Sequence, residues 1–304
     1  MRPFLSVYGH VTIDQIITVE NFPEIGKTED VTSSTTVLGG TGTNIAMTAA
    51  RLGCPTAICA FVGDDFPQAY QDEMGRSGLI MDEFVRVHGC DSSKAIVIND
   101  SSLLQKVLFY QGPQGFPDRF GIRLDKNASE SRHVHFCTGQ PSYYLSLMEG
   151  LHGASIALDP AQESHRIWNG ENLPLALGFA GTLFCNEIEG KSLAGYMGKE
   201  DVLDLPTGMV VCTMSERGSV ARIGDEVFRI PAVKPARFVD ATGAGDSYRA
   251  GYYAALYRGY SAPEALTIAA SVSSFVVEKT GALSNTPAWD DALERAEPYL
   301  KEIS

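Results

Sequence analysis

A junction between an extended apolar stretch and a glycine-rich helix start, at residues 238–247, constrains this chain more than any other part of its sequence. Phe238 and Val239 lead into two closely spaced glycines, Gly243 and Gly245, and a segment rich in Ala and Tyr follows at once. Glycines lack the Cβ atoms that would block close approach, and the free N–H groups of a first helical turn attract anions. The junction therefore predicts a phosphate-binding site.

Asp246 is the unusual member of this junction, because a carboxylate repels a phosphate. Such a placement is useful when the carboxylate must take a proton from an attacking hydroxyl, so Asp246 is a candidate general base. The alternative is an ordinary helix start, in which Asp240, Thr242 and Asp246 cap the helix and complement its dipole. Taken alone, the junction leaves both interpretations open.

The junction resembles the D-T-x-G-A-G-D signature of the ribokinase-like (PfkB) family of carbohydrate kinases, with Ala241 in the place of the usual Thr. The resemblance implies that the amides of Gly243, Ala244 and Gly245 stabilise charge on the transferred phosphoryl group. It also implies that Asp246 deprotonates the acceptor hydroxyl. A kinase reaction is therefore expected.

A second glycine-rich stretch, residues 39–46, opens another predicted helix, which ends before Gly53. This stretch resembles the first signature of the same family, G-G-x-x-x-N-x-A. The resemblance implies that Gly40 and Asn44 contact substrate hydroxyls. A Rossmann dinucleotide fingerprint is excluded, because its third glycine would fall at Ile45.

Strands and helices alternate along most of the chain, which is typical of a parallel sheet. Strands are predicted at residues 4–8, 56–62, 133–137 and 155–158, with helices between them. Polar residues follow these strands, at the edge where open α/β sheets bind ligands, and Asp14, Gln140 and Gln162 are the candidates there. Taken alone, Asp14 fits a turn better, whereas the family resemblance implies that it grips two sugar hydroxyls.

Two polar residues, three positions apart, follow the predicted strand at residues 183–185. Asn186 and Glu189 resemble the N-x-x-E motif of the family, although the same spacing also arises from helix capping. The resemblance implies that Glu189 helps to organise Mg²⁺ and phosphate through water, with Asn186 near the phosphates of ATP. It also allows a monovalent cation such as K⁺, held partly by carbonyl groups near Asp240 and Thr242.

The segment after residue 209 resembles the T-x-G-x-x-G nucleotide loop of the family. Thr213 and Gly218 keep their places in this motif, and Ser215 replaces the first glycine. Gly281 follows the position at which the adenine pocket of the family closes. The resemblance thus implies that these residues contact the phosphates, the ribose and the base of ATP.

Two β-rich blocks, at about residues 15–38 and 83–112, interrupt the alternation of strands and helices. Because helices separate the blocks, we expect them to pair in space as a small β-sheet lid over the active site. The predicted fold is α/β and ribokinase-like: a central, mostly parallel sheet flanked by helices (an α/β/α sandwich), with the 304 residues forming a single kinase domain that carries the lid. Paired lids would also offer sheet edges for a homodimer.

The composition narrows the class of protein. With 44% hydrophobic residues, the chain can bury a large core, and no apolar run approaches the roughly 18 to 20 residues that span a bilayer. Met1 to Pro3 lead into a strand-like segment instead of a signal peptide, so a cytoplasmic location is expected. The net charge of −13 argues against nucleic acid and anionic membranes as partners. The six cysteines contain no C-x-x-C pair, so structural zinc is not expected.

The acceptor follows less directly from the sequence. Family members that act on ribose or sugar phosphates commonly have Lys where Thr41 stands, so Thr41 favours a neutral acceptor. Apolar residues of the lid blocks could cover a nucleobase, although ordinary lid packing explains them equally: Ile96, Ile98, Leu103, Leu104, Phe109 and Tyr110. In such a site Gln140 or Gln162 would hydrogen-bond the base.

Residues 109–115 and 159–162 also resemble adenosine and nucleoside kinases of this superfamily. The predicted activity is therefore ATP-dependent transfer of the γ-phosphoryl group to a hydroxymethyl group of a nucleoside. A free sugar is the alternative acceptor. A non-catalytic regulator that binds a ligand on a kinase scaffold is the remote alternative.

Overall fold

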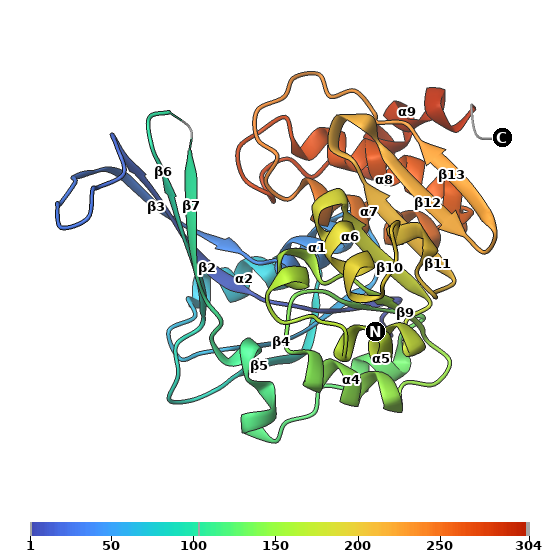
Figure 1. Ribbon diagram of the computed structural model, residues 1–304, viewed down its shortest axis with the longest axis horizontal. Coiled ribbons are helices and arrows are strands. Elements are labelled where there is room, and N and C mark those ends of the chain that lie inside the picture. Colours follow the sequence, from blue (N-terminus) through green and yellow to red (C-terminus); the bar gives the residue numbers. More distant parts are fainter. Residues whose placement is uncertain (1, 103, 302–304) are drawn as a thin grey trace.

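A large nine-stranded sheet and a smaller four-stranded sheet form the framework of the computed structural model, which describes residues 2–102 and 104–301 (Figure 1). The large sheet has the strand order β13-β12-β11-β10-β9-β8-β1-β4-β5, and the small sheet has the order β3-β2-β6-β7. The strands of the large sheet are β1 (Leu5–Tyr8), β4 (Thr56–Val62), β5 (Ile80–Arg86), β8 (His133–Phe136), β9 (Ser155–Leu158), β10 (Thr182–Asn186), β11 (Met209–Thr213), β12 (Ser219–Ile223) and β13 (Glu226–Ile230). Those of the small sheet are β2 (Thr12–Val19), β3 (Val31–Gly39), β6 (Ser93–Asn99) and β7 (Gln105–Tyr110). The expected ribokinase-like α/β fold with a small β-sheet is confirmed.

Helices cover both faces of the large sheet and divide the interior into two cores. The helices are α1 (Thr41–Arg51), α2 (Gln68–Arg76), α3 (Lys126–Glu130), α4 (Pro141–Gly150), α5 (Asn172–Phe179), α6 (Glu187–Tyr196), α7 (Ala244–Tyr257), α8 (Ala262–Val276) and α9 (Trp289–Leu300). One core contains buried residues of α1, α7 and α8, and the other contains buried residues of α4, α5 and α6. Successive residues of a strand point to opposite faces, so Val7 enters the first core and Tyr8 the second. Among the described residues, no helix is long and apolar enough to cross a bilayer.

In the large sheet, the seven strands β5, β4, β1, β8, β9, β10 and β11 are parallel to one another. β12 and β13 add an antiparallel edge beside β11. β4 is buried along its whole length, as expected for an apolar strand with helices on both sides. β12 and β13 form a hairpin around Gly224 and Asp225. Since the carboxyl ends of parallel strands meet at one edge, the loops after β1, β8, β9, β10 and β11 converge there.

The small sheet forms the lid, and its second block begins later than expected. β2 and β3 correspond to the first expected block, although β2 already begins at Thr12, but β5 pairs in parallel with β4 and so belongs to the large sheet. Residues 83–92 are therefore not part of the lid, whose second half consists of β6 and β7. The error arose because β5 is only partly buried and carries charged residues, so its sequence is typical of an exposed strand. Leu103, one of the proposed lid residues, lies outside the described residues, as does Met1.

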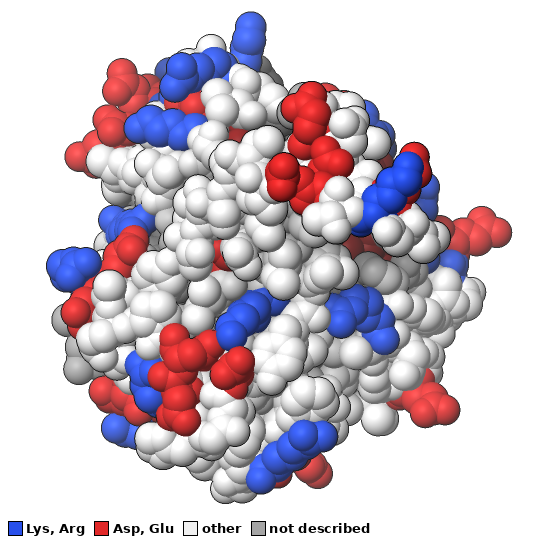
Figure 2. Space-filling model, turned by 90° about the vertical axis from the view of Figure 1, so that its left-hand side faces the viewer, with Lys and Arg blue, Asp and Glu red and all other residues white. Residues whose placement is uncertain are grey.

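The lid projects from one side of the molecule (Figure 1). It also exposes apolar side chains. Val31, Val107, Leu108 and Tyr110 of its strands each keep about half or more of their surface exposed. Figure 2 shows this side of the molecule. Acidic and basic residues lie next to one another in several groups, and broad areas of surface between the groups carry no charge.

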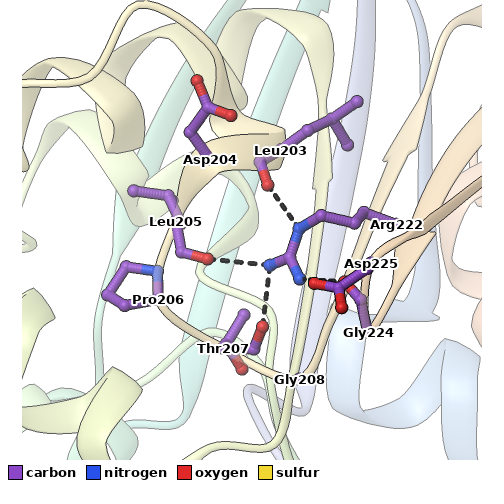
Figure 3. A pocket seen from close by; sticks show the side chains of 9 residues that line it. All are labelled: Leu203, Asp204, Leu205, Pro206, Thr207, Gly208, Arg222, Gly224 and Asp225. Carbon is purple, nitrogen blue, oxygen red and sulfur yellow. Dashed lines mark hydrogen bonds between the residues drawn. The ribbon is translucent and has the colours of Figure 1, made fainter.

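A shallow pocket of about 550 Å³ lies far from the converging loops, between the segment that enters β11 and the end of β12 (Figure 3). Arg222 occupies it and donates hydrogen bonds to the carbonyl oxygens of Leu203, Leu205, Thr207 and Gly224. Because its guanidinium donates hydrogen bonds to these carbonyl oxygens, Arg222 stabilises the loop before β11.

Replacing Arg222 by Ala is expected to lower the free energy of unfolding by about 2 kcal/mol, because four carbonyls lose a charged donor. Turnover should not change, since the pocket lies at the opposite end of β11 from Thr213. Urea unfolding measures the loss. The control is Arg229→Ala on β13, where the side chain is exposed and the change should stay within about 0.5 kcal/mol. Equal effects of the two variants would contradict this stabilising role of Arg222.

Candidate active site

The start of α7 faces the start of α1 at the edge where the strand ends converge, and this contact brings Asp246 and Asn44 together. The side-chain amide of Asn44 donates a hydrogen bond of 2.7 Å to the Asp246 carboxylate. Burial raises the pKa of Asp246 from 3.8 to about 6, the Asp159 carboxylate also raises it, and Asn44 and Arg249 lower it. Asp246 is thus a carboxyl that titrates close to neutral pH.

The glycines before α7 leave free amide groups beside this carboxyl. Gly243 has a φ of 75°, and a Cβ atom there would lie 2.3 Å from the Cβ of Ala282, so only glycine fits. The Ala244 amide donates to the carbonyl of Ala241, whereas the amides of Gly243 and Gly245 have no acceptor within residues 2–102 and 104–301. Free amides at a helix start are suited to bind an anion.

Asp240 fixes the shape of the loop that leads into α7. One carboxylate oxygen accepts hydrogen bonds from the amide and the hydroxyl of Thr242, and the other accepts one from the amide of Gly281. Gly281 is thereby held next to the loop. The side chain of Ala241 is exposed, and none of these bonds depends on it.

Asp14 lies on the lid strand β2 and packs against Gly39, one of the two glycines that precede α1. A Cβ atom on Gly39 would lie 2.0 Å from the Asp14 carboxylate, and one on Gly40, where φ is 97°, would lie 2.3 Å from the carbonyl oxygen of His10. Thr12 donates a hydrogen bond to Asp14, and burial raises the pKa of this carboxyl. Asp14 therefore lies beside the glycine turn that leads into α1, the helix that carries Asn44.

Asn186 and Glu189 form a capping box at the start of α6. Asn186 accepts hydrogen bonds from the amides of Ile188 and Glu189, and the Glu189 carboxylate accepts one from the amide of Asn186. Burial raises the pKa of Glu189, and the charges of Asp159 and Asp246 raise it further. Asn186 and Glu189 therefore cap α6, as the alternative interpretation of this pair predicted. Glu189 also lies close enough to Asp246 to interact electrostatically with its charge.

Ser215 follows the backbone path that a glycine would take. It begins the short 3-10 helix η5 (Ser215–Arg217), and its φ of 54° lies in the left-handed region that glycine adopts freely. Gly218 has a φ of 83°, and a Cβ atom there would lie 2.1 Å from the carbonyl oxygen of Ile230. Thr213, at the end of β11, donates to the carbonyl of Cys185.

The two proposed glutamines differ in their surroundings. Gln140 is half-buried at the start of α4, next to the strand ends, whereas Gln162 is exposed in the 3-10 helix η3 (Ala161–His165). Phe109 pairs with Ala95, which pairs with Asp14, so Phe109 and Asp14 share one lid face. Ile96, Ile98 and Tyr110 alternate with these residues and lie on the other face of the lid.

Several polar residues near the site have no counterpart among the sequence-based candidates. His10 bonds to the hydroxyl of Thr138, and burial lowers the pKa of His10 to about 4, so its imidazole is neutral. The buried carboxylate of Glu163 accepts hydrogen bonds from the amide of Gly139 and from Gln111 at the end of the lid. No sequence motif marks these residues, because each contact joins segments far apart in the chain.

Arg249 is a further residue that sequence reasoning missed. It forms a buried ion pair with Asp159, at the end of β9, and lies one helical turn after Asp246. A charged residue in a helix that is otherwise mostly apolar was the signal that could have indicated it.

Comparison with known proteins places this arrangement among kinases. The model of the pfkB family of carbohydrate kinases matches residues 2–289. A nucleoside kinase of Methanothermobacter thermautotrophicus is 32% identical over 299 residues, which cover 97% of this chain and 95% of that protein. The crystal structure of Methanocaldococcus jannaschii nucleoside kinase superposes with a TM-score of 0.90 at 28% identity and covers 98% of this chain and 99% of that one. A ribokinase of Bacillus subtilis is 24% identical over 314 residues, 95% of this chain and 98% of that protein.

Proposed function

Because the chain belongs to the pfkB family of carbohydrate kinases, and so is a phosphotransferase with an alcohol as acceptor, we propose that it is an ATP-dependent nucleoside kinase. The observation that carries this proposal is the pairing of the half-buried, hydrogen-bonded Asp246 carboxyl with the free amides of Gly243 and Gly245. A base and an anion site side by side are what transfer of a phosphoryl group to a hydroxyl requires. The similarity to archaeal nucleoside kinases supports the nucleoside as acceptor.

In the proposed mechanism, Asp246 accepts the proton of a hydroxymethyl group as the oxygen of that group attacks the γ-phosphorus of ATP in line. The bond between the γ-phosphorus and the bridging oxygen of the β-phosphate breaks, and ADP leaves. The free amides at the start of α7, with Ala244 between them, stabilise the charge on the transferred group. Asn44 orients Asp246 through its hydrogen bond, and this contact gives it a role beyond the substrate contact expected from its motif. Asp14 and Gly40 would hold the hydroxyls of the sugar, which positions the attacking oxygen.

The remaining candidates divide between the base of the acceptor and the nucleotide. Phe109, on the same lid face as Asp14, and Gln140, beside the strand ends, would contact the nucleobase, and the exposed Gln162 is the weaker candidate. The residues proposed to contact ATP lie at the end of β10 and the start of α6, at the end of β11 and just after it, and beyond α8: Asn186, Glu189, Thr213, Gly218 and Gly281.

The reaction is proposed to need Mg²⁺, with K⁺ as a second ion. Among the described residues, no group of three His, Cys, Asp or Glu side chains could form a metal cage. Mg²⁺ tolerates such a site, because it keeps several waters and binds substrate phosphates together with one or two carboxylates. Glu189 is the carboxylate that would hold it through water, where the ion neutralises charge on the phosphates. Backbone carbonyls near Asp240 and Thr242 would hold K⁺.

A panel of acceptors tests the proposed function. ATP consumption with Mg²⁺ is measured with purine and pyrimidine nucleosides, with ribose and fructose, and with sugar phosphates. Phosphorylation of nucleosides at the highest kcat/KM supports the proposal. Preference for a free sugar would instead support the ribokinase-like alternative. No turnover with any acceptor would leave the binding regulator.

The rate should fall in mild acid, because a protonated carboxyl cannot act as a base. The carboxyl of Asp246 has a pKa of about 6, so kcat/KM is expected to fall as the pH drops through 6 and to level off above about 7. A pH series of initial rates checks this prediction. A rate that stays constant down to pH 5 would contradict it.

The lid is also proposed to join two chains into a homodimer. Leu108 lies on the face opposite to Asp14, and both Leu108 and the neighbouring Tyr110 are largely exposed. Such exposed apolar patches are typical of interaction sites. Sedimentation should give a dimer, and Leu108→Glu should give a monomer. A monomeric wild-type protein would contradict this proposal.

We also propose that residues 1–304 form a single kinase domain and that the protein is located in the cytoplasm.

A further inference from the structure

A buried ion pair lies directly beneath the start of α7. Arg249 Nε donates to Asp159 at 2.7 Å, and a terminal nitrogen of the same guanidinium lies 3.4 Å from the other carboxylate oxygen. The side chains of Arg249 and Asp159 are only 5% and 3% exposed. Burial raises the pKa of Asp159, but Arg249 and His135 outweigh this effect and keep the carboxyl ionised. The pair is thus a clamp between β9 and α7.

The clamp holds the guanidinium against the anion-binding turn. Side chains in a helix point back toward its amino end, and Arg249 follows this rule: one terminal nitrogen donates to the carbonyl of Gly245 at 3.3 Å. A Cβ atom on Gly245 would lie 3.1 Å from the same nitrogen, so the glycine allows the close approach. The positive charge therefore lies next to the residue that precedes Asp246.

Asp246 is surrounded by groups of both signs, and Arg249 supplies the positive charge. The groups that face it come from five elements and include Asn44 on α1, Arg249 on α7 itself, Asp159 after β9, Glu189 on α6 and Cys137 after β8. Asn44 is neutral, and burial raises the pKa of the Cys137 thiol so that it stays neutral too. His135, behind Asp159, is neutral because burial lowers its pKa. The guanidinium of Arg249 thus offsets, at Asp246, the negative charges of Asp159 and Glu189.

We propose that Arg249 is a positioning residue for the Asp246 base: clamped by Asp159, its guanidinium fixes the first turn of α7 and stabilises the charged form of the Asp246 carboxylate. The inference rests on the proposed function, because it assigns a partner to the base of that reaction. Arg249 acts through Asp246 and the backbone of Gly245. Its charge lowers the pKa of Asp246, so the base stays ionised at neutral pH.

Opposite substitutions in the clamp should move the pH profile in opposite directions. Removing the positive charge with Arg249→Met should shift the pH of half-maximal kcat upward by about one unit, since an opposite charge nearby favours the ionised carboxylate. Removing the negative charge with Asp159→Asn should shift it downward, because the Asp159 charge disfavours ionisation of Asp246. Arg249→Lys keeps the charge and should leave the midpoint within a few tenths of a unit, with a lower kcat.

The experiment measures kcat between pH 5 and 9 for these variants, with thermal unfolding of each to confirm folding. The matched control is Arg258→Met, which removes the same charge from the other end of α7, where Arg258 bonds to the carbonyls of Ala254 and Leu52. This control should lose stability and keep the wild-type midpoint. A loss of kcat in Arg249→Met that is equal at every pH would overturn the proposal, because a merely structural role predicts that result.

Two provisions keep the outcomes separate. If Arg249→Met does not fold, Arg249→Gln decides, because it removes the same charge and keeps a polar side chain: an upward shift supports the proposal, and an unchanged midpoint overturns it. The wild-type protein on the same acceptor tests the proposed function independently. Any alcohol that it phosphorylates serves for the pH series, so a failure of the nucleoside assignment leaves the Arg249 test intact.

Discussion

Replacing Asp246 by Asn is expected to reduce kcat by about 10²- to 10⁴-fold, the usual contribution of a general base. The two side chains have the same shape, and the oxygen of Asn can still accept the hydrogen bond from Asn44. The substitution therefore removes the proton acceptor and leaves the geometry of the site in place. The KM for the acceptor should change little, since binding of its hydroxyls is assigned to other residues.

The same variant should be more stable than the wild-type protein at pH 7. The pKa of Asp246 is raised in the folded state, from 3.8 to about 6, because burial disfavours its charged form. The folded state thus binds the proton more tightly, and this stabilisation is present in acid and is lost as the pH rises from about 4 to 6. Asn stays neutral at every pH and avoids the loss.

Initial rates and thermal unfolding at pH 5 and pH 8 measure both effects. Asp225→Asn, at an exposed turn between β12 and β13, is the matched control and should leave kcat and stability unchanged. Turnover of Asp246→Asn near the wild-type rate would remove Asp246 from the mechanism. A variant that fails to fold would instead indicate that the charged carboxylate is needed structurally.

The sequence was sufficient for the parts of the fold in which local signals agree. β4 and β9 occupy the expected residues, because each is an apolar run of strand length bounded by turn residues. The capping box of α8, between Ser261 and Glu264, can be recognised in the sequence, since it depends only on residues three apart. The order of motifs along the chain also placed the site at one edge of the sheet.

The sequence was insufficient where distant segments decide the outcome. β5 joins the large sheet because α2 returns the chain beside β4, and nothing in its partly polar sequence records that partner. Which lid residues face the site depends on the register between β2, β6 and β7, and a shift of one residue would exchange the two faces. Phe109 is therefore distinguished from Ile96 only once the pairing is known.

The polar contacts of the candidate site could not be predicted from the sequence either, because they join residues that are far apart along the chain. The motif identified Asn44 and Asp246 separately, but the hydrogen bond that joins them spans 202 residues of sequence. The ion pair between Arg249 and Asp159 spans 90 residues, and no family motif names Arg249. Spacing rules report on neighbours along the chain, so charges that meet only through the fold stay hidden.

Gly243→Ala is expected to reduce kcat by about 10²- to 10³-fold, the usual cost of disturbing an anion-binding donor. The added methyl would lie 2.7 Å from the Cα and 2.3 Å from the Cβ of Ala282, so the loop must move and carry the free amides with it. Gly121→Ala is the matched control: its φ of 62° is similarly left-handed, but a Cβ atom there meets nothing within 4 Å. Both variants should lose about 1 to 2 kcal/mol from the backbone conformation alone, and only Gly243→Ala should lose turnover and additional stability. Equal stability losses with turnover retained in both would mean that contact with Ala282 does not shape the anion site.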